Sequence, residues 1–253
     1  MSAEMKSRRW RRVLGWALAV VIAPSTVAWA VLYRDSVLQR RKAERLFAEF
    51  QKFTPGVATA AEVRALMERY SGKAISDSAC SPDDFVYETT VENYRALPDS
   101  IFQRLPTISV LVMDRTGLRS WIVYLHVEVK QGLLQKSRYS LRLLSSARLD
   151  CYYAIASIEK SQTNQSHYVD ADKGAKPYSV HPTNLTSSCG GEPIRIELDN
   201  RASEQERAHA YDLRFSFLTN FFSNIKTADI APSAWQDWKE AERIMDAEPS
   251  SKD

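Results

Sequence analysis

Glycine is scarce in this sequence, where only eight of the 253 residues are glycine. None of them forms the glycine-rich run that cradles a phosphate, and no serine lies in the Gly-x-Ser-x-Gly turn of a hydrolase. The four histidines have no metal-binding partner at a helical or short-loop spacing. The sequence therefore predicts no catalytic residue, no metal ligand and no cofactor, and it favours a protein that is not an enzyme.

Cysteine is also rare, with residues at Cys80, Cys151 and Cys189 and no Cys-x-x-Cys spacing for zinc. Three cysteines are too few for a disulfide-rich scaffold. In an oxidising compartment, a disulfide between Cys151 and Cys189 would tie down the polar segment between them. The alternative is three reduced thiols in the interior.

Charge is absent from residues 13–33, a stretch that begins at Val13 and ends at Tyr33. About 20 mostly apolar residues cross a hydrocarbon core of about 30 Å, so a transmembrane helix is predicted here, with the lipid membrane as its partner. Pro24 near its middle predicts a kink. Aromatic side chains, which favour the headgroup layer, lie toward the two ends of the stretch: Trp10, Trp16, Trp29 and Tyr33.

A cleaved secretory signal is the alternative interpretation of the same segment. It has a basic start in residues 1–12, an apolar core, and the small-residue pattern Ala28-Trp29-Ala30. Cleavage after Ala30 would release a secreted protein. However, Val31 and Leu32 carry the apolar run past that position, and helical periodicity continues beyond it. These features favour an uncleaved anchor.

Arginines flank the apolar stretch on both sides and nearly cancel in the positive-inside count. A short basic tail, residues 1–12, is most easily left in the cytoplasm while the following domain is exported. We therefore expect a single-pass membrane protein with a cytoplasmic amino end and an extracytoplasmic main domain. Beyond residue 45, acidic residues outnumber basic ones, so no nucleic-acid-binding domain is predicted.

Helical periodicity continues through residues 34–53, where apolar side chains recur every three or four positions among Arg, Lys and Glu. This pattern indicates an amphipathic helix that extends the anchor and packs on the folded domain. Thr59 and Glu62 have the spacing of a capping box, which predicts a second helix over residues 60–71. Gly72 is expected to end that helix in the left-handed conformation.

Alternating apolar residues predict strands in the middle of the chain. The strands are expected at residues 85–91, 108–113, 118–130, 133–144, 151–158 and 194–198, with a long polar loop at 159–191. A long helix capped by Ser203, a final helix from Pro232 and a flexible tail at 247–253 follow. The exported domain, residues 54–246, is thus α+β, an antiparallel meander with helices packed on one face.

The same alternation predicts the register of the hairpin formed by the strands at 118–130 and 133–144. A three-residue loop, residues 130–132, keeps apolar odd-numbered positions opposite one another and pairs Trp121 with Leu141 and Val123 with Tyr139. A two-residue turn would pair odd with even positions, so the pattern excludes it.

The most site-like cluster of the sequence lies on the outer face of this hairpin. The predicted register sets His126 opposite Lys136 and Tyr124 opposite Arg138, which suggests a binding patch for an anion. A solvated strand face, or one covered by a helix, is the alternative interpretation.

Two functions remain compatible with the sequence. The first is a membrane-tethered binding or assembly subunit, whose exported domain presents the sheet face or the polar loop to a protein partner. The second is a hydrolase-like or transferase-like enzyme with a site assembled from scattered residues such as His126, His181, Asp170 and Tyr178. Convergence of those side chains in one cleft would favour the enzyme.

Overall fold

The computed structural model describes residues 3–75, 81, 83–93, 115–144, 152–160, 178–182, 194–221 and 227–247. The cysteines, the strand expected at 108–113, Asp170 and the tail after residue 247 lie outside these ranges, as does most of the loop expected at 159–191. In the first part of the chain, side chains are described at Trp16 and from Ala19 onward.

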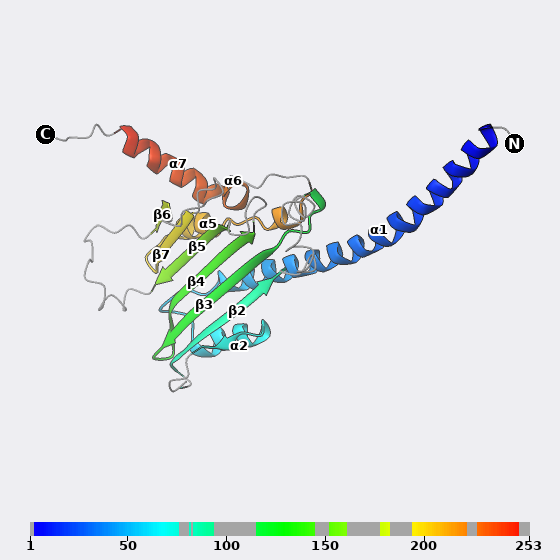
Figure 1. The fold of residues 1–253 in the computed structure, drawn as a ribbon. Coiled ribbons are helices and arrows are strands. Elements are labelled where there is room, and N and C mark those ends of the chain that lie inside the picture. Colours follow the sequence, from blue (N-terminus) through cyan, green and yellow to red (C-terminus); the bar gives the residue numbers. More distant parts are fainter. Residues whose placement is uncertain are drawn as a thin grey trace.

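One helix, α1 (Ala3–Phe50), covers the helical stretches expected at 13–33 and 34–53, and it runs from one into the other without a break, as the continuing periodicity predicts. Its carboxyl half lies along the sheet, and its amino half continues away from the domain (Figure 1). The helix runs through Pro24, and just after it Ser25 Oγ donates to the Val21 carbonyl and Thr26 Oγ1 to the Ile22 carbonyl, each over 2.8 Å. These bonds cover polar hydroxyls on an apolar helix surface. Among the described residues, no helix has the length and hydropathy needed to cross a membrane, so the transmembrane helix stays a prediction.

Seven strands form one sheet in the order β1-β2-β3-β4-β5-β7-β6. Their bounds are Lys73–Ala74 (β1), Phe85–Glu92 (β2), Trp121–Lys130 (β3), Leu133–Leu144 (β4), Tyr152–Lys160 (β5), Tyr178–Pro182 (β6) and Ile194–Asp199 (β7). Strands β2 to β5 are antiparallel neighbours, as the meander predicts, and β1, where no strand is predicted, pairs antiparallel with β2. Strand β7 runs parallel to β5. The meander is therefore wrong at its end, where β6 lies inside the expected loop and pairs with the far side of β7.

Shorter helices complete the α+β fold. They are α2 (Ala60–Arg69), α5 (Glu204–Ala210), the 3-10 helix η2 (Ser216–Thr219), α6 (Thr227–Ile230) and α7 (Pro232–Ala247). The predicted capping box of Thr59 and Glu62 is confirmed. Ser203 caps α5 as expected, but the long helix predicted after it is wrong, since α5 ends at Ala210.

The prediction for the end of α2 is also wrong. Ser71, and not Gly72, has the positive φ of 59°. Gly72 is needed for a different reason: its amide donates to the Met67 carbonyl over 2.6 Å, and a Cβ at this position would lie 2.9 Å from that same oxygen. The glycine therefore allows close approach of two backbone segments.

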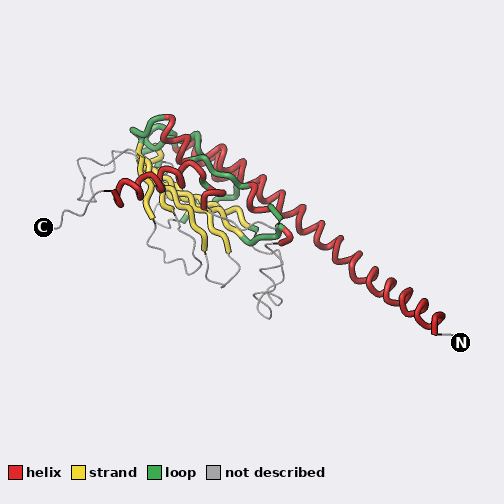
Figure 2. The backbone as a smooth tube through the Cα atoms, turned by 90° about the horizontal axis from the view of Figure 1, so that it is seen from above, coloured by secondary structure: helices red, strands yellow, loops and turns green. Residues whose placement is uncertain are grey.

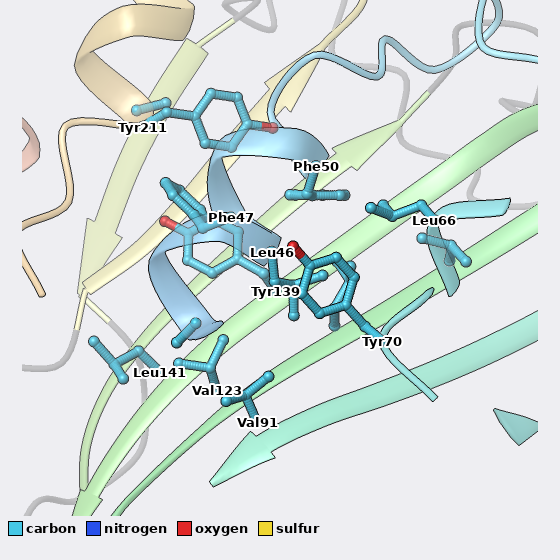
Figure 3. Packing of buried hydrophobic residues seen from close by; sticks show 14 of the residues in the cluster. Leu46, Phe47, Phe50, Leu66, Tyr70, Val91, Val123, Tyr139, Leu141 and Tyr211 are labelled. Atoms are coloured by element: carbon cyan, nitrogen blue, oxygen red, sulfur yellow. The ribbon is translucent and has the colours of Figure 1, made fainter. Parts of the chain in front are cut away.

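The hydrophobic core lies between the sheet and the carboxyl half of α1. Figure 3 shows Leu46, Phe47 and Phe50 of α1 among side chains from the strands, from α2 and from the segment after α5. Odd-numbered positions of β3 point into this core, and all five are buried: Trp121, Val123, Leu125, Val127 and Val129. We call this side of the sheet the covered face and the opposite side, which carries the even-numbered residues of β3, the open face. Figure 2 shows α1 following the sheet and then leaving it.

The register of the β3–β4 hairpin differs from the predicted one. Lys130 pairs with Leu133 across a two-residue turn, in which Gln131 and Gly132 have φ values of 53° and 76°. A β-bulge with Gln135 as the extra residue of β4 then restores odd-to-odd pairing. The bulge therefore keeps apolar odd-numbered positions opposite one another, which the three-residue loop was expected to do. As a result, Trp121 pairs with Leu143 and Val123 with Leu141, two residues beyond the predicted partners.

Candidate functional site

The open face brings the four predicted site residues together. Tyr124 and His126 project from β3, with His126 directly opposite Arg138 and Tyr124 opposite Ser140 on β4. Lys136 lies opposite Glu128. The clustering on one face follows from the alternation, whereas the expected pairs, His126 with Lys136 and Tyr124 with Arg138, are wrong because of the bulge.

Glu88 of β2 is the residue at the centre of this cluster. It pairs with His126 across the β2–β3 ladder, and its Oε1 accepts the Tyr124 hydroxyl proton and lies 3.1 Å from His126 Nδ1. Sequence reasoning missed Glu88, although it alternates with buried positions of β2 in the same way as His126 does on β3. A carboxylate therefore lies where an anionic ligand was expected.

Charges on the open face are arranged by strand. Glu88 and Glu92 project from β2, whereas Lys136, Arg138 and Arg142 project from β4. The intervening Glu128 is bound by Lys130, with Nζ 2.6 Å from Oε1. The open face thus carries acidic side chains on β2 and basic side chains on β4, with β3 between the two strands.

The enzyme hypothesis needs His126 and Tyr178 in one cleft, and they lie on opposite faces of the sheet. Tyr178 pairs with the buried Leu198, and its hydroxyl donates to Asp237 Oδ2 on α7 over 2.6 Å. Burial, together with Asp237, raises the pKa of Tyr178, which keeps the phenol protonated as a donor. His209 of α5 lies 3.4 Å from the same oxygen. This group ties β6, α5 and α7 together. The side chain of His181 is not among those described.

A second group that the sequence did not predict is an ion pair under the helices. Glu159 of β5 is 1% exposed, and it binds Arg207 of α5 and accepts a hydrogen bond from the Tyr211 hydroxyl over 2.6 Å. Burial raises the pKa of Glu159, against the opposing effect of Tyr211 and Arg207. Glu159 was assigned to the start of the polar loop, although it continues the alternation of β5 onto the covered face, because Ser137 and Leu198 are its neighbours.

The described side chains form no metal-binding cluster. Within the described ranges, no three His, Cys, Asp or Glu residues gather closely enough to hold a metal ion. A gap of about 10 Å³ between α1 and the sheet is lined by apolar residues and Tyr139. That volume is at the lower limit for a single water molecule, so the gap holds no ligand.

The junction where α1 leaves the domain combines aromatic and polar contacts. We call residues 115–120 and 216–221, which contact α1 there, the collar. Trp29 and Tyr33 stack at 5.3 Å between ring centroids, and both rings contact Phe221, at 5.9 and 5.2 Å. Trp29 Nε1 also donates to the Thr116 carbonyl over 3.3 Å. One aromatic cluster thus joins the helix to both collar segments.

Polar bonds fix the next turns of α1 to the same region. Ser36, fully buried, accepts a hydrogen bond from Asn93 Nδ2 over 2.9 Å, and Arg40 Nη1 donates to Thr219 Oγ1 over 2.6 Å. Arg119 joins the two collar segments by donating to the carbonyls of Phe217 and Asn220. The helix is therefore held at the collar by directional contacts as well as by packing.

No protein-family model, curated protein or solved structure matches this chain. Function is therefore inferred from the chain's own residues. The open face and the free part of α1 are the two surfaces from which that inference starts.

Proposed function

We propose that this protein is a single-pass membrane-anchored binding or assembly subunit. Residues 13–33 of α1 cross the bilayer with the amino end in the cytoplasm, and the α+β domain lies outside the cytoplasm. Its open face binds a protein partner whose surface carries complementary mixed charge. No catalytic role is part of this proposal.

The observation that carries the proposal is the apolar surface of the amino half of α1. Trp16 is 75% exposed and Val20 68% exposed, and further large apolar side chains are exposed around the helix at Val21, Ile22, Val27 and Val31. A helix in water normally keeps apolar residues on one stripe, and a helix that is apolar all round needs apolar surroundings. The absence of charge from residues 13–33 supports lipid as those surroundings.

The contacts of Trp29 support an uncleaved anchor. Cleavage after Ala30 would remove Trp29, whose ring and Nε1 contact the collar at Phe221 and Thr116. It would also interrupt α1, which is continuous from Ala3 to Phe50. A cleaved secretory signal normally has no such contacts to the mature domain, so secretion is the less favoured alternative.

The arrangement of the helices supports the open face as the binding surface. The hydrophobic cluster that joins α1, α2 and α7 to the sheet lies on the covered face. The open face instead carries half-exposed and exposed polar and charged side chains of β2, β3 and β4, among them Glu88, His126 and Arg138. Rows of opposite charge set specificity and register when two proteins associate.

Accessibility of two introduced cysteines tests both export and binding. In the full-length chain, Arg138→Cys places a thiol on the open face, and Val57→Cys places one in the segment after α1, where Val57 is 69% exposed. A membrane-impermeant maleimide is added to intact native cells and, separately, to the purified protein in detergent, and labelling above that of the unmodified chain is measured.

We expect both thiols to react in the purified protein, and only Val57→Cys to react strongly in cells, because the partner covers residue 138. Failure of Val57→Cys to react in intact cells would contradict export. Equal reaction of both thiols in cells would contradict a binding partner on the open face.

A further inference from the structure

We infer that the collar is a lipid-contacting surface, with Phe221 inserted into the headgroup layer of the same leaflet from which α1 emerges. This inference rests on the proposed transmembrane role of residues 13–33. It goes further, because a domain with a transmembrane anchor can lie at a distance from the bilayer surface, whereas we infer that this domain contacts it.

The length of the free helix is the first reason. From Val13 to the collar contact at Trp29, α1 rises about 24 Å at about 1.5 Å per residue. The hydrocarbon core of a bilayer is about 30 Å thick. The apolar part of α1 that lies clear of the domain is therefore too short to cross alone, and the turn that holds Trp29 and Tyr33 must also enter the membrane. The collar contacts that turn and follows it to the interface.

The chemistry of the collar is the second reason. Phe221 is 42% exposed although it packs on both Trp29 and Tyr33, so one side of the aromatic cluster remains uncovered. Trp and Tyr rings favour the layer between hydrocarbon and water, where one edge is apolar and the other is hydrated. Arg34, the first charged residue after the apolar stretch, is exposed and lies one position beyond Tyr33, at the level where lipid phosphates are expected.

The rigidity of the junction is the third reason. A Cβ at Gly117, which has a φ of 72°, would lie 2.7 Å from the Thr219 carbonyl and 3.2 Å from the Tyr33 ring. The collar segments therefore approach each other and α1 as closely as glycine permits. Together with the Ser36 and Arg40 bonds, this contact gives the domain one fixed position on the helix, so the collar cannot swing away from the interface.

Photo-crosslinking to lipid tests the inference on the full-length chain in phosphatidylcholine vesicles. The photoreactive residue p-benzoylphenylalanine is placed in three separate variants, at Phe221 in the collar, at Val21 in the free helix and at Val57 beyond the carboxyl end of α1. All three native side chains are exposed, so the replacement disturbs no core. Protein–lipid adducts are measured by mass spectrometry after illumination.

The expected result is adduct formation at positions 21 and 221, with a yield at 221 several-fold above that at 57. Adducts at 21 with none at 221 would overturn the collar inference and leave the proposed anchor intact. Absence of adducts at 21 would contradict the proposed anchor itself. Equal yields at 221 and 57 would show non-specific contact of the domain with lipid and would also overturn the inference.

Discussion

The two halves of α1 are one continuous helix with opposite relations to the rest of the protein. The carboxyl half buries Ala43, Leu46 and Phe50 on the sheet and exposes charged side chains at Arg41, Lys42 and Arg45. The amino half exposes apolar side chains at Trp16, Val20 and neighbouring positions. The collar marks the boundary between the halves.

The difference between the two halves shows that the distribution of apolar residues around a helix indicates what surrounds that helix. The carboxyl half has an apolar stripe, which needs one packed neighbour, and the domain supplies it. The amino half has no polar side to turn toward water between residues 13 and 33. The helix backbone is the same in both halves, so the side chains alone distinguish the half that packs in the protein core from the half for which we propose a membrane.

The largest expected effect comes from placing charge in the amino half. Val21→Arg combined with Ile22→Arg puts two guanidinium groups near the centre of the proposed span, at a cost of about 5 to 7 kcal/mol on the translocon insertion scale. We expect the double variant to be lost from the alkali-washed membrane fraction on immunoblots. The control, Leu38→Arg with Ala48→Arg, changes two exposed positions of the carboxyl half and should leave membrane retention unchanged.

Removal of a core ring in the carboxyl half should have the next largest effect. This change should lower the stability of the folded domain and leave membrane retention unchanged. Phe50→Ala removes a buried ring that contacts Tyr139 and Tyr211, and should lower the free energy of unfolding by about 3 to 5 kcal/mol. Urea unfolding of the full chain in detergent measures it. Trp16→Ala, in the amino half, should leave the unfolding midpoint of the domain where it is; an equal loss in both variants would break the comparison between the halves.

A smaller effect is expected at the boundary. Asn93→Ala removes the Nδ2 donor that serves both buried Ser36 of α1 and the Arg119 carbonyl of the collar. The loss should lower the free energy of unfolding by about 1 to 3 kcal/mol, because both acceptors remain buried. Asn200→Ala, in an exposed turn, is the control and should change it by less than about 0.5 kcal/mol. Equal values for the two variants would mean that the polar contacts at the collar do not hold α1.

The smallest expected effect is on the pH dependence of the free energy of unfolding of the domain, which membrane retention by the amino half of α1 should not share. The pKa of Glu159 is raised above 4.5 by burial, so the folded state binds its proton more tightly than the unfolded state. Its contribution to the free energy of unfolding is greatest below that value and falls as pH rises through the raised pKa, with a slope of at most about 1.4 kcal/mol per pH unit. Glu159→Gln should remove this fall in urea titrations across that range, whereas exposed Glu240→Gln should preserve it.

Membrane retention should show no such pH dependence, because residues 13–32 contain no titratable side chain. A parallel change of retention and domain stability with pH would argue that α1 is held in the membrane fraction through the folded domain. Independent behaviour is the expected result.

Side-chain periodicity predicts much of this fold. The capping box at Thr59, the helix cap at Ser203, the strand limits of β4 and the start of α7 at Pro232 follow from local patterns, because local hydrogen bonds and burial decide them. The long helix predicted after Ser203 is wrong because the chain after α5 is irregular, with the Arg214 amide donating to the Ile230 carbonyl, and then forms the short 3-10 helix η2. Phe215 and Leu218 reach the core from this part of the chain. Helical spacing of buried residues does not require a helix.

The candidate site was predicted to the correct face but not to the correct pairs. Alternation alone places Tyr124, His126 and Arg138 on one side of the sheet. The bulge at Gln135 depends on a turn held by a distant segment, since Asp84 Oδ1 accepts from the Gln131 amide over 2.7 Å. The position of Glu88 beside His126 and the parallel β5–β7 pair likewise depend on strand order, which no local pattern contains.

The most direct test of the proposed membrane anchor is the intact mass of the protein recovered from alkali-washed membranes of its native host. We expect a chain that retains residues 1–30 and stays in the membrane pellet after carbonate extraction. Recovery in the soluble fraction of a chain that begins at Val31 would contradict it, because Trp29 and the free half of α1 would then be absent from the mature protein.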